Sequence, residues 1–135
     1  MKTVFLDTNI LVDYALGREH CDDAEQLLQH GKNGEVRLAA SYLTFANMAY
    51  ILKGKADVYN LFNDLHIIID VLPNDDSQLL AAMSQRVRDF EDMLQYQCAK
   101  ASGCDVIVTN NGRDFADFCD LPFMTAAEFL RQMSE

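Results

Sequence analysis

Apolar and polar residues along the chain form two kinds of pattern that alternate. Short apolar runs rich in β-branched residues are typical of buried strands, and longer segments with apolar residues three and four positions apart are typical of amphipathic helices. The short runs predict five strands, of which the third has the strongest pattern and the last is a short edge strand: residues 2–7, 35–40, 67–71, 105–109 and 121–124.

Helical patterns fill the segments between the predicted strands. Helices are expected at residues 10–31, with a break at Gly17, and at 41–52, 57–65, 77–87, 89–101 and 125 onward. Because strands alternate with helices throughout, the pattern predicts an α/β fold, an α/β/α sandwich with a mostly parallel central sheet.

Length and composition agree with one globular domain. The chain has 135 residues, of which 50% are hydrophobic and 24% are charged, and no repeat or linker interrupts it, which predicts a single domain over residues 1–135. The four cysteines include no C-x-x-C pair and only three histidines are present, which argues against a zinc ribbon or a thioredoxin motif. Without a signal peptide or a membrane-spanning run, a reducing cytoplasmic location is expected.

Acidic residues outnumber basic residues by 21 to 11, which gives a net charge of −10. This balance excludes the broad basic surface with which most sequence-tolerant nucleic-acid binders neutralise phosphate. The excess of acids can reflect a solvated acidic surface or a ligand-binding site. The positions of the acids along the chain distinguish these two explanations.

Several polar residues come directly after predicted strands. Asp7 ends the first strand, and Thr109, Asn111 and Asp114 follow the fourth. In parallel sheets the carboxyl ends of the strands share one edge, and ligands bind there. These four side chains are therefore expected to lie close together.

A predicted helix adds Asp89, Glu91 and Asp92 to the acids expected at this edge. Carboxylates that converge repel one another unless a cation offsets their charge. Oxygen ligands suit Mg²⁺ or Mn²⁺, and such a metal can activate water for phosphodiester hydrolysis without a histidine.

Each of these acids also has a purely structural explanation. Asp7 can cap the helix that follows it, Asp89 and Asp92 occupy cap and third positions of a helix, and Asp114 can close a turn. The acids at 75–76 are interpreted as a helix cap and nothing more. Only the joint arrangement separates these alternatives.

Three blocks of sequence, in this order, resemble the PIN domain, the nuclease family that includes VapC-type toxins. The blocks are residues 4–13 (VFLDTNILVD), 89–99 (DFEDMLQYQCA) and 106–115 (VIVTNNGRDF). The resemblance covers essentially the whole chain and implies a PIN-like fold that uses Mg²⁺ or Mn²⁺.

Position by position, the resemblance assigns metal-binding and catalytic roles to three acids. Asp7 matches the first metal-binding acid of the family, Asp92 matches the acid of the later helix, and Asp114 matches a further acid. Asn9 and Thr109 match polar residues that line the family's site.

The chain departs from the family pattern at two amides. Asn47 stands where the family usually has Glu, and Asn111 stands where many members have Asp. An amide offers a carbonyl oxygen to a cation but no charge, so metal affinity is expected to fall. A weakened site, a changed metal requirement and a site that no longer cleaves all remain open.

Arg113 is the best candidate for a phosphate contact, because it precedes Asp114. A solvated surface position is the better explanation for Arg113 itself and for the four other candidate cations, Arg18, Lys53, Lys55 and Lys100. With so few cations, RNA is expected to bind locally, through metal and one or two basic side chains.

The leading hypothesis is an Mg²⁺- or Mn²⁺-dependent endoribonuclease that acts as the toxin of a toxin-antitoxin pair. The resemblance implies an RNA substrate, an antitoxin partner that offers an arginine or an apolar helix, and a homodimer. The alternative is a catalytically weakened PIN-like module that binds RNA or protein. A third alternative, a phosphoryl-accepting domain, is disfavoured. A haloacid-dehalogenase-type phosphatase needs an acid two residues after the first Asp, where this chain has Asn9. A response-regulator receiver needs a mid-chain Asp at the end of a strand, whereas Asp57 lies in a helical pattern.

Overall fold

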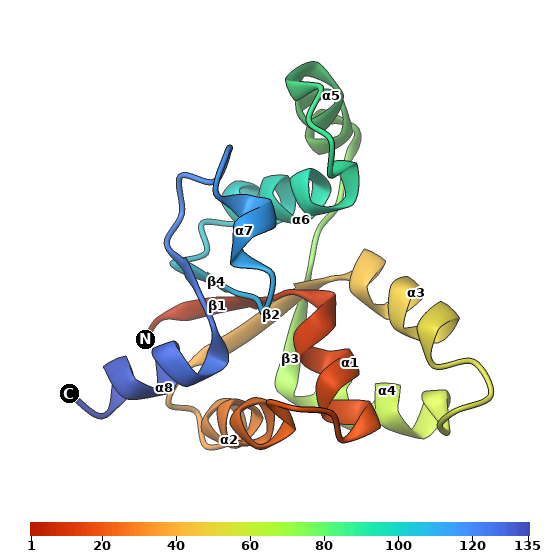
Figure 1. Ribbon diagram of the computed structural model, residues 1–135, viewed down its shortest axis with the longest axis vertical. Helices are drawn as coiled ribbons and strands as arrows, with labels where there is room; N and C mark the ends of the chain where they lie inside the picture. Colours follow the sequence, from red (N-terminus) through yellow and green to blue (C-terminus); the bar gives the residue numbers. More distant parts are fainter.

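Five parallel strands form the centre of the computed structural model, which describes residues 1–135 (Figure 1). Their order across the sheet is β3-β2-β1-β4-β5, and every neighbouring pair is parallel. The strands are β1 (Thr3–Leu6), β2 (Arg37–Ser41), β3 (Ile69–Leu72), β4 (Val106–Val108) and β5 (Phe123–Met124).

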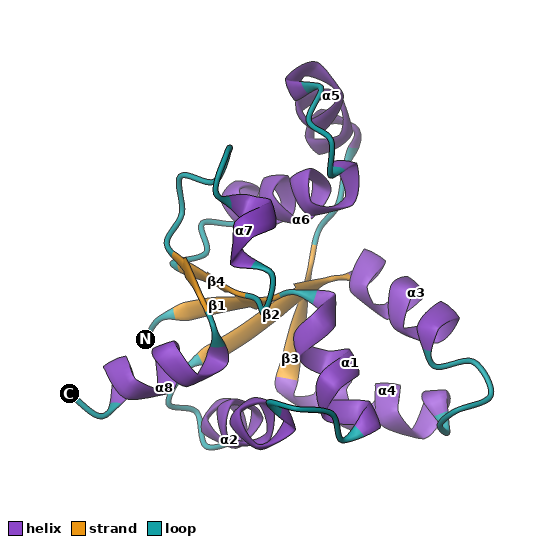
Figure 2. Ribbon diagram, in the orientation of Figure 1, coloured by secondary structure: helices purple, strands orange, loops and turns teal.

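Helices cover both faces of this sheet (Figure 2). One face packs against α1 (Thr8–Leu16), α2 (Cys21–Lys32), α3 (Tyr42–Ile51), α4 (Val58–Ile68) and α8 (Ala126–Met133). The other packs against α5 (Asp76–Gln85), α6 (Phe90–Ala101) and α7 (Gly112–Phe115). The predicted α/β/α sandwich is confirmed, and its sheet is parallel throughout.

Alternation along the strands builds a hydrophobic core on each face of the sheet. In β1, Val4 and Leu6 join the cluster under α1 and α2, whereas Phe5 joins the cluster under α6. In β4, Val106 and Val108 face the first cluster and Ile107 the second. Because β1 and β4 are buried on both faces, these two strands have the continuous apolar runs seen in the sequence.

The predicted third strand is wrong at its start. Helix α4 continues to Ile68, and β3 begins only at Ile69. Leu61, Leu65 and Ile68 lie on one helical face that packs into the core, whereas Ile67 is 83% exposed. Helical spacing toward the core therefore outweighs the β-branched character of this run.

The structure also differs from the sequence pattern at the first helix and after the fourth strand. The first helix begins at Thr8 rather than residue 10, and the polar segment after β4 contains the short helix α7. Phe115 at the end of α7 is fully buried, which fixes this turn against the sheet.

Side chains cap several of the helices, including the cap expected at residues 75–76. Ser41 accepts a hydrogen bond from the backbone N–H of Leu43 at 2.9 Å, and Asp75 accepts one from Gln78 at 3.1 Å. Thr125 and Glu128 form a reciprocal capping box at the start of α8. No helix combines the length and apolar character that crossing a bilayer requires.

Gly31 allows α2 to approach the sheet closely, and its substitution tests this packing. A Cβ atom at this position would lie 2.7 Å from Leu38 Cγ and 3.2 Å from Ile68 Cγ2. Gly31→Ala is therefore expected to lower the free energy of unfolding by about 1–3 kcal/mol, measured by urea denaturation. Gln26→Ala, on the exposed side of the same helix, is the control; equal stability of both variants would contradict the close packing.

Candidate active site

Asp7 lies at the junction between β1 and α1, and both of its carboxylate oxygens are engaged. Oδ1 accepts a hydrogen bond from the backbone N–H of Thr8 at 2.8 Å, so this oxygen caps α1. Oδ2 accepts hydrogen bonds from the Thr109 hydroxyl at 2.8 Å and the Asn9 amide at 3.0 Å. The side chain is thus both a helix cap and part of the polar cluster expected at the sheet edge.

Amide side chains join the segment after β4 to the start of α1. The backbone N–H of Asn110 donates to Asn9 Oδ1 at 3.0 Å, and Asn110 Nδ2 donates to Asp13 Oδ2 at 2.7 Å. The backbone N–H of Asn111 donates to Thr109 Oγ1 at 3.0 Å. The parallel pairing of β1 with β4 brings these two segments together, as predicted from the strand ends.

Helices α6 and α7 supply a second group of acids. One carboxylate oxygen from each of Asp89, Asp92 and Asp114 lies within 4.8 Å of the others. None of the structure's ion pairs involves these three carboxylates. Although Asp89 occupies the N-cap position of α6, its side chain makes no capping hydrogen bond, so the capping explanation fails for this residue.

The electrostatics of the site favour protonation or a cation. The pKa of Asp92 is raised to about 7, first by burial and then by the negative charges of Asp7, Asp114, Glu91 and Asp89. Burial also raises the pKa of Asp7, although the hydrogen bonds to its oxygens lower it. Converging carboxylates with few positive neighbours are the environment that a divalent cation relieves.

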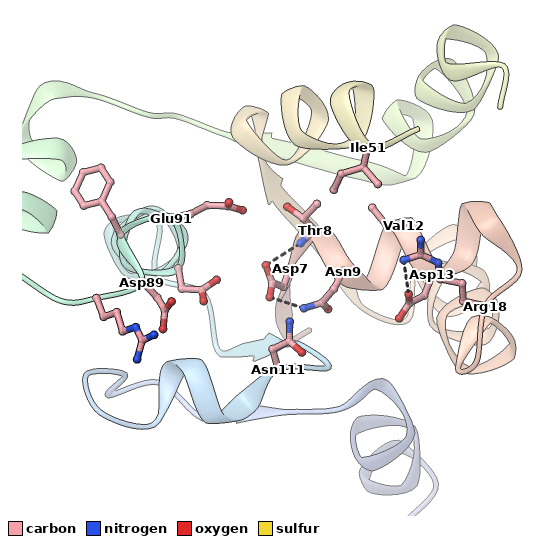
Figure 3. A pocket seen from close by; sticks show the side chains of 13 residues that line it. Asp7, Thr8, Asn9, Val12, Asp13, Arg18, Ile51, Asp89, Glu91 and Asn111 are labelled. Atoms are coloured by element: carbon pink, nitrogen blue, oxygen red, sulfur yellow. Dashed lines mark hydrogen bonds and ion pairs between the residues drawn. The ribbon is translucent and has the colours of Figure 1, made fainter. Parts of the chain in front are cut away.

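An open pocket of about 500 Å³ lies between the start of α1 and the start of α6 (Figure 3). In Figure 3, Asp7, Asn9 and Asn111 stand on one side and Asp89 and Glu91 on the α6 side. The lining residues are Asp7, Thr8, Asn9, Val12, Asp13, Arg18, Ile51, Arg88, Asp89, Phe90, Glu91, Asp92 and Asn111.

Four predicted site residues lie outside this lining. Thr109 and Asp114 belong to the polar and acidic groups described above, whereas Asn47 and Arg113 belong to neither. Asn47 does not border the pocket; its Nδ2 donates a hydrogen bond to Glu91 Oε1 at 2.7 Å. Arg113 is exposed, makes no ion pair, and does not border the pocket either.

The pocket instead contains two other arginines. Arg18, interpreted from the sequence as a surface residue, lines it with its Nη1 3.9 Å from Asp13 Oδ1. Arg88, which was not expected at the site, lines it from the loop just before α6. Arg88 immediately precedes Asp89, the first residue of the second block, and this position could have identified it as a site residue.

A buried polar network fixes α6 relative to α1 and α3. Gln95 Nε2 donates to the hydroxyls of Thr44 at 2.8 Å and Thr8 at 3.3 Å, and the two hydroxyls lie 3.2 Å apart. Since Thr8 follows Asp7 and Gln95 lies one helical turn after Asp92, this network sets the spacing between the two groups of acids.

The donor set fits a hard divalent cation. Asp89, Asp92 and Asp114 present converging carboxylate oxygens, and Asn111 lines the same pocket from the side of Asp7 and Asn9. No histidine or cysteine lines the pocket, and oxygen ligands suit Mg²⁺ or Mn²⁺ better than softer metals.

Comparisons with known proteins bear on the family and the fold of the chain. The family model described as the PIN domain matches residues 3–113. The fold is similar to a chain in the crystal structure of VapBC2 from Rickettsia felis bound to a DNA fragment from their promoter, with a TM-score of 0.65 and 20% identity over 90% of this chain and 96% of that chain. A comparison with curated proteins finds no match.

Proposed function

Because the chain belongs to the PIN-domain family, we propose that it is an Mg²⁺- or Mn²⁺-dependent endoribonuclease that hydrolyses RNA phosphodiester bonds. One observation carries this proposal. The carboxylates of Asp89, Asp92 and Asp114 converge, without cationic partners, at the edge of the sheet where Asp7 ends β1.

The acids and amides of the pocket have distinct roles in this proposal. Asp92 and Asp114, with Asp89, hold the cation, and Asp7 completes its negative surroundings. When bound, the cation supplies Lewis acidity to the phosphodiester and to the attacking water. Thr109 and Asn9 keep the Asp7 carboxylate in one orientation through their hydrogen bonds.

The arginines of the pocket restrict how RNA can bind. Arg18 and Arg88 are the cations that line the pocket, and both are exposed. They can position one or two phosphates but cannot follow a long strand, so the grip on RNA is local. We assign the phosphate-contact role to these residues rather than to Arg113.

The partner and location follow from the family resemblance. The similar fold in the VapBC2 structure supports a toxin role with an antitoxin protein as partner. Exposed apolar side chains on α3 and α5, such as Tyr42, Leu80 and Met83, offer surface for protein contacts, including a homodimer. Four free cysteines agree with a cytoplasmic location.

A second candidate function is a PIN-like module that binds RNA or protein without cutting. It is favoured by the amides at Asn47 and Asn111, where family members commonly carry acids. Each amide removes one negative charge from the neighbourhood of the cation.

An RNA cleavage assay separates the two functions. Purified protein is incubated with mixed single-stranded RNA in Mn²⁺, and in parallel with a chelator. Cleavage in Mn²⁺ alone, lost in the Asp7→Asn, Asp92→Asn double variant, is the expected result. Asp64→Asn, an exposed acid of α4, is the control. Equal cleavage by the double variant would refute the nuclease, and RNA binding without cleavage would favour the module.

A further inference from the structure

A hydrogen bond between Asn47 and Glu91 connects α3 to α6 beside the pocket. Asn47 Nδ2 donates to Glu91 Oε1 at 2.7 Å, across 44 residues of sequence. Glu91 lines the pocket, and in Figure 3 its side chain extends from α6 toward the junction where Asp7 and Thr8 lie. Asn47 is half-buried and Glu91 is exposed, so the amide holds a solvent-accessible carboxylate at the pocket wall opposite Asp7.

Glu91 is close enough to the other acids to affect them electrostatically. Its negative charge raises the pKa of both Asp7 and Asp92. No ion pair in the structure neutralises Glu91. Glu91 thus lines the pocket as an unneutralised charge that acts on both Asp7 and Asp92.

The chemistry of the pair explains why an amide suits position 47. An amide nitrogen orients a carboxylate by donating a hydrogen bond, and it leaves the carboxylate's charge in place. A carboxylate at the same position would have no hydrogen to donate to Glu91. Asn47 carries no charge itself, but its hydrogen bond positions the charged side chain of Glu91.

We propose that Asn47 is a positioning residue that holds Glu91 toward the pocket, and that Glu91 is an additional carboxylate for the divalent cation. This inference rests on the proposed function only in requiring that the pocket binds such a cation. In this proposal α3 contributes a neutral hydrogen-bond donor, Asn47, and α6 contributes the negative charge, on Glu91.

Mn²⁺ titration calorimetry at about pH 7.5 tests the pair by a double-mutant cycle. Glu91→Gln is expected to weaken Mn²⁺ binding by about tenfold, and Asn47→Ala by about three- to tenfold. The double variant is expected to bind no more weakly than Glu91→Gln alone, because the amide acts only through Glu91. Asn47→Gln, which retains the donor, is expected to bind more tightly than Asn47→Ala.

Glu25→Gln removes the same charge from the exposed surface of α2 and is the matched control. Thermal unfolding of each metal-free variant verifies the fold. Binding by Glu91→Gln equal to that of Glu25→Gln, additive losses in the double variant, or no Mn²⁺ binding by the natural chain would each overturn the inference.

The cleavage assay keeps the two proposals apart. If Mn²⁺ binding depends on Glu91 but RNA is not cut, the inference stands and the nuclease fails. If RNA is cut in Mn²⁺ and Glu91→Gln binds like the control, the nuclease stands and the inference fails.

Discussion

Asp92→Asn is expected to lower the rate of RNA cleavage by at least about 100-fold and, at the same time, to stabilise the metal-free protein. The loss of activity follows because the variant removes a cation-binding carboxylate. The gain in stability follows because the folded protein holds Asp92 among four other acids with its pKa raised to about 7. Asparagine has a similar shape and no charge to bury.

The gain in stability has a defined pH dependence. Asp92 has an ordinary pKa in the unfolded chain, near 3.8, and a pKa of about 7 in the folded protein, so the energetic cost of its charge accumulates between these values. The stabilisation by Asp92→Asn is therefore small near pH 4, grows toward pH 7, and is constant above it. We expect about 1–2 kcal/mol above pH 7, after allowance for the solvent that reaches this half-buried group.

Differential scanning calorimetry at about pH 5 and about pH 8 measures this difference. Asp64→Asn makes the same chemical change on the exposed surface of α4 and is expected to leave the melting temperature unchanged at both values. A destabilised Asp92→Asn variant, or one that still cleaves RNA at the natural rate, would show that Asp92 is a structural residue.

The natural metal-free protein is expected to lose stability as the pH rises from about 5 to about 7.5. In this range the folded state binds more protons than the unfolded state, because the folded pKa of Asp92 and that of Asp7 are both raised. Glu35, Asp75 and Glu128 have lowered pKa values in the folded state, so their stabilisation is lost only at more acidic pH.

Mn²⁺ is expected to reverse this trend. The cation competes with the proton on Asp92, so its affinity is expected to rise by about 25-fold between about pH 5.5 and about pH 7.5 and then to level off. Melting temperature against pH, with and without Mn²⁺, and calorimetric titration at each pH measure both effects. The pH dependence of Mn²⁺ affinity is expected to flatten in Asp92→Asn; a natural protein with pH-independent affinity would contradict the assignment of Asp92 to the cation site.

Much of the architecture was predictable from local pattern. Apolar runs and helical spacing identified each strand segment and the parallel α/β/α class, because burial on both faces makes β1 and β4 continuously apolar. The start of β3 was mispredicted, since Ile67 and Ile68 are compatible with either structure and only the packing of Ile68 on the core extends α4.

The site was predictable where residues follow strands directly. Asp7, Thr109 and Asn111 were expected at one edge, and their hydrogen bonds show them there, because β1 and β4 pair in parallel. The capping alternatives could be separated only by geometry: Asp7 does cap its helix, and Asp89 does not.

By itself, the sequence determined the fold class, the strand-end residues and the ordered blocks of the family, because these depend on periodicity and on neighbours along the chain. The tertiary structure decided which helix-borne side chains meet. It placed Arg88 in the pocket, joined Asn47 to Glu91, and decided that Asp89 meets Asp92 and Asp114 instead of capping α6. Such contacts depend on how helices cross a common sheet, which local spacing along one chain does not specify.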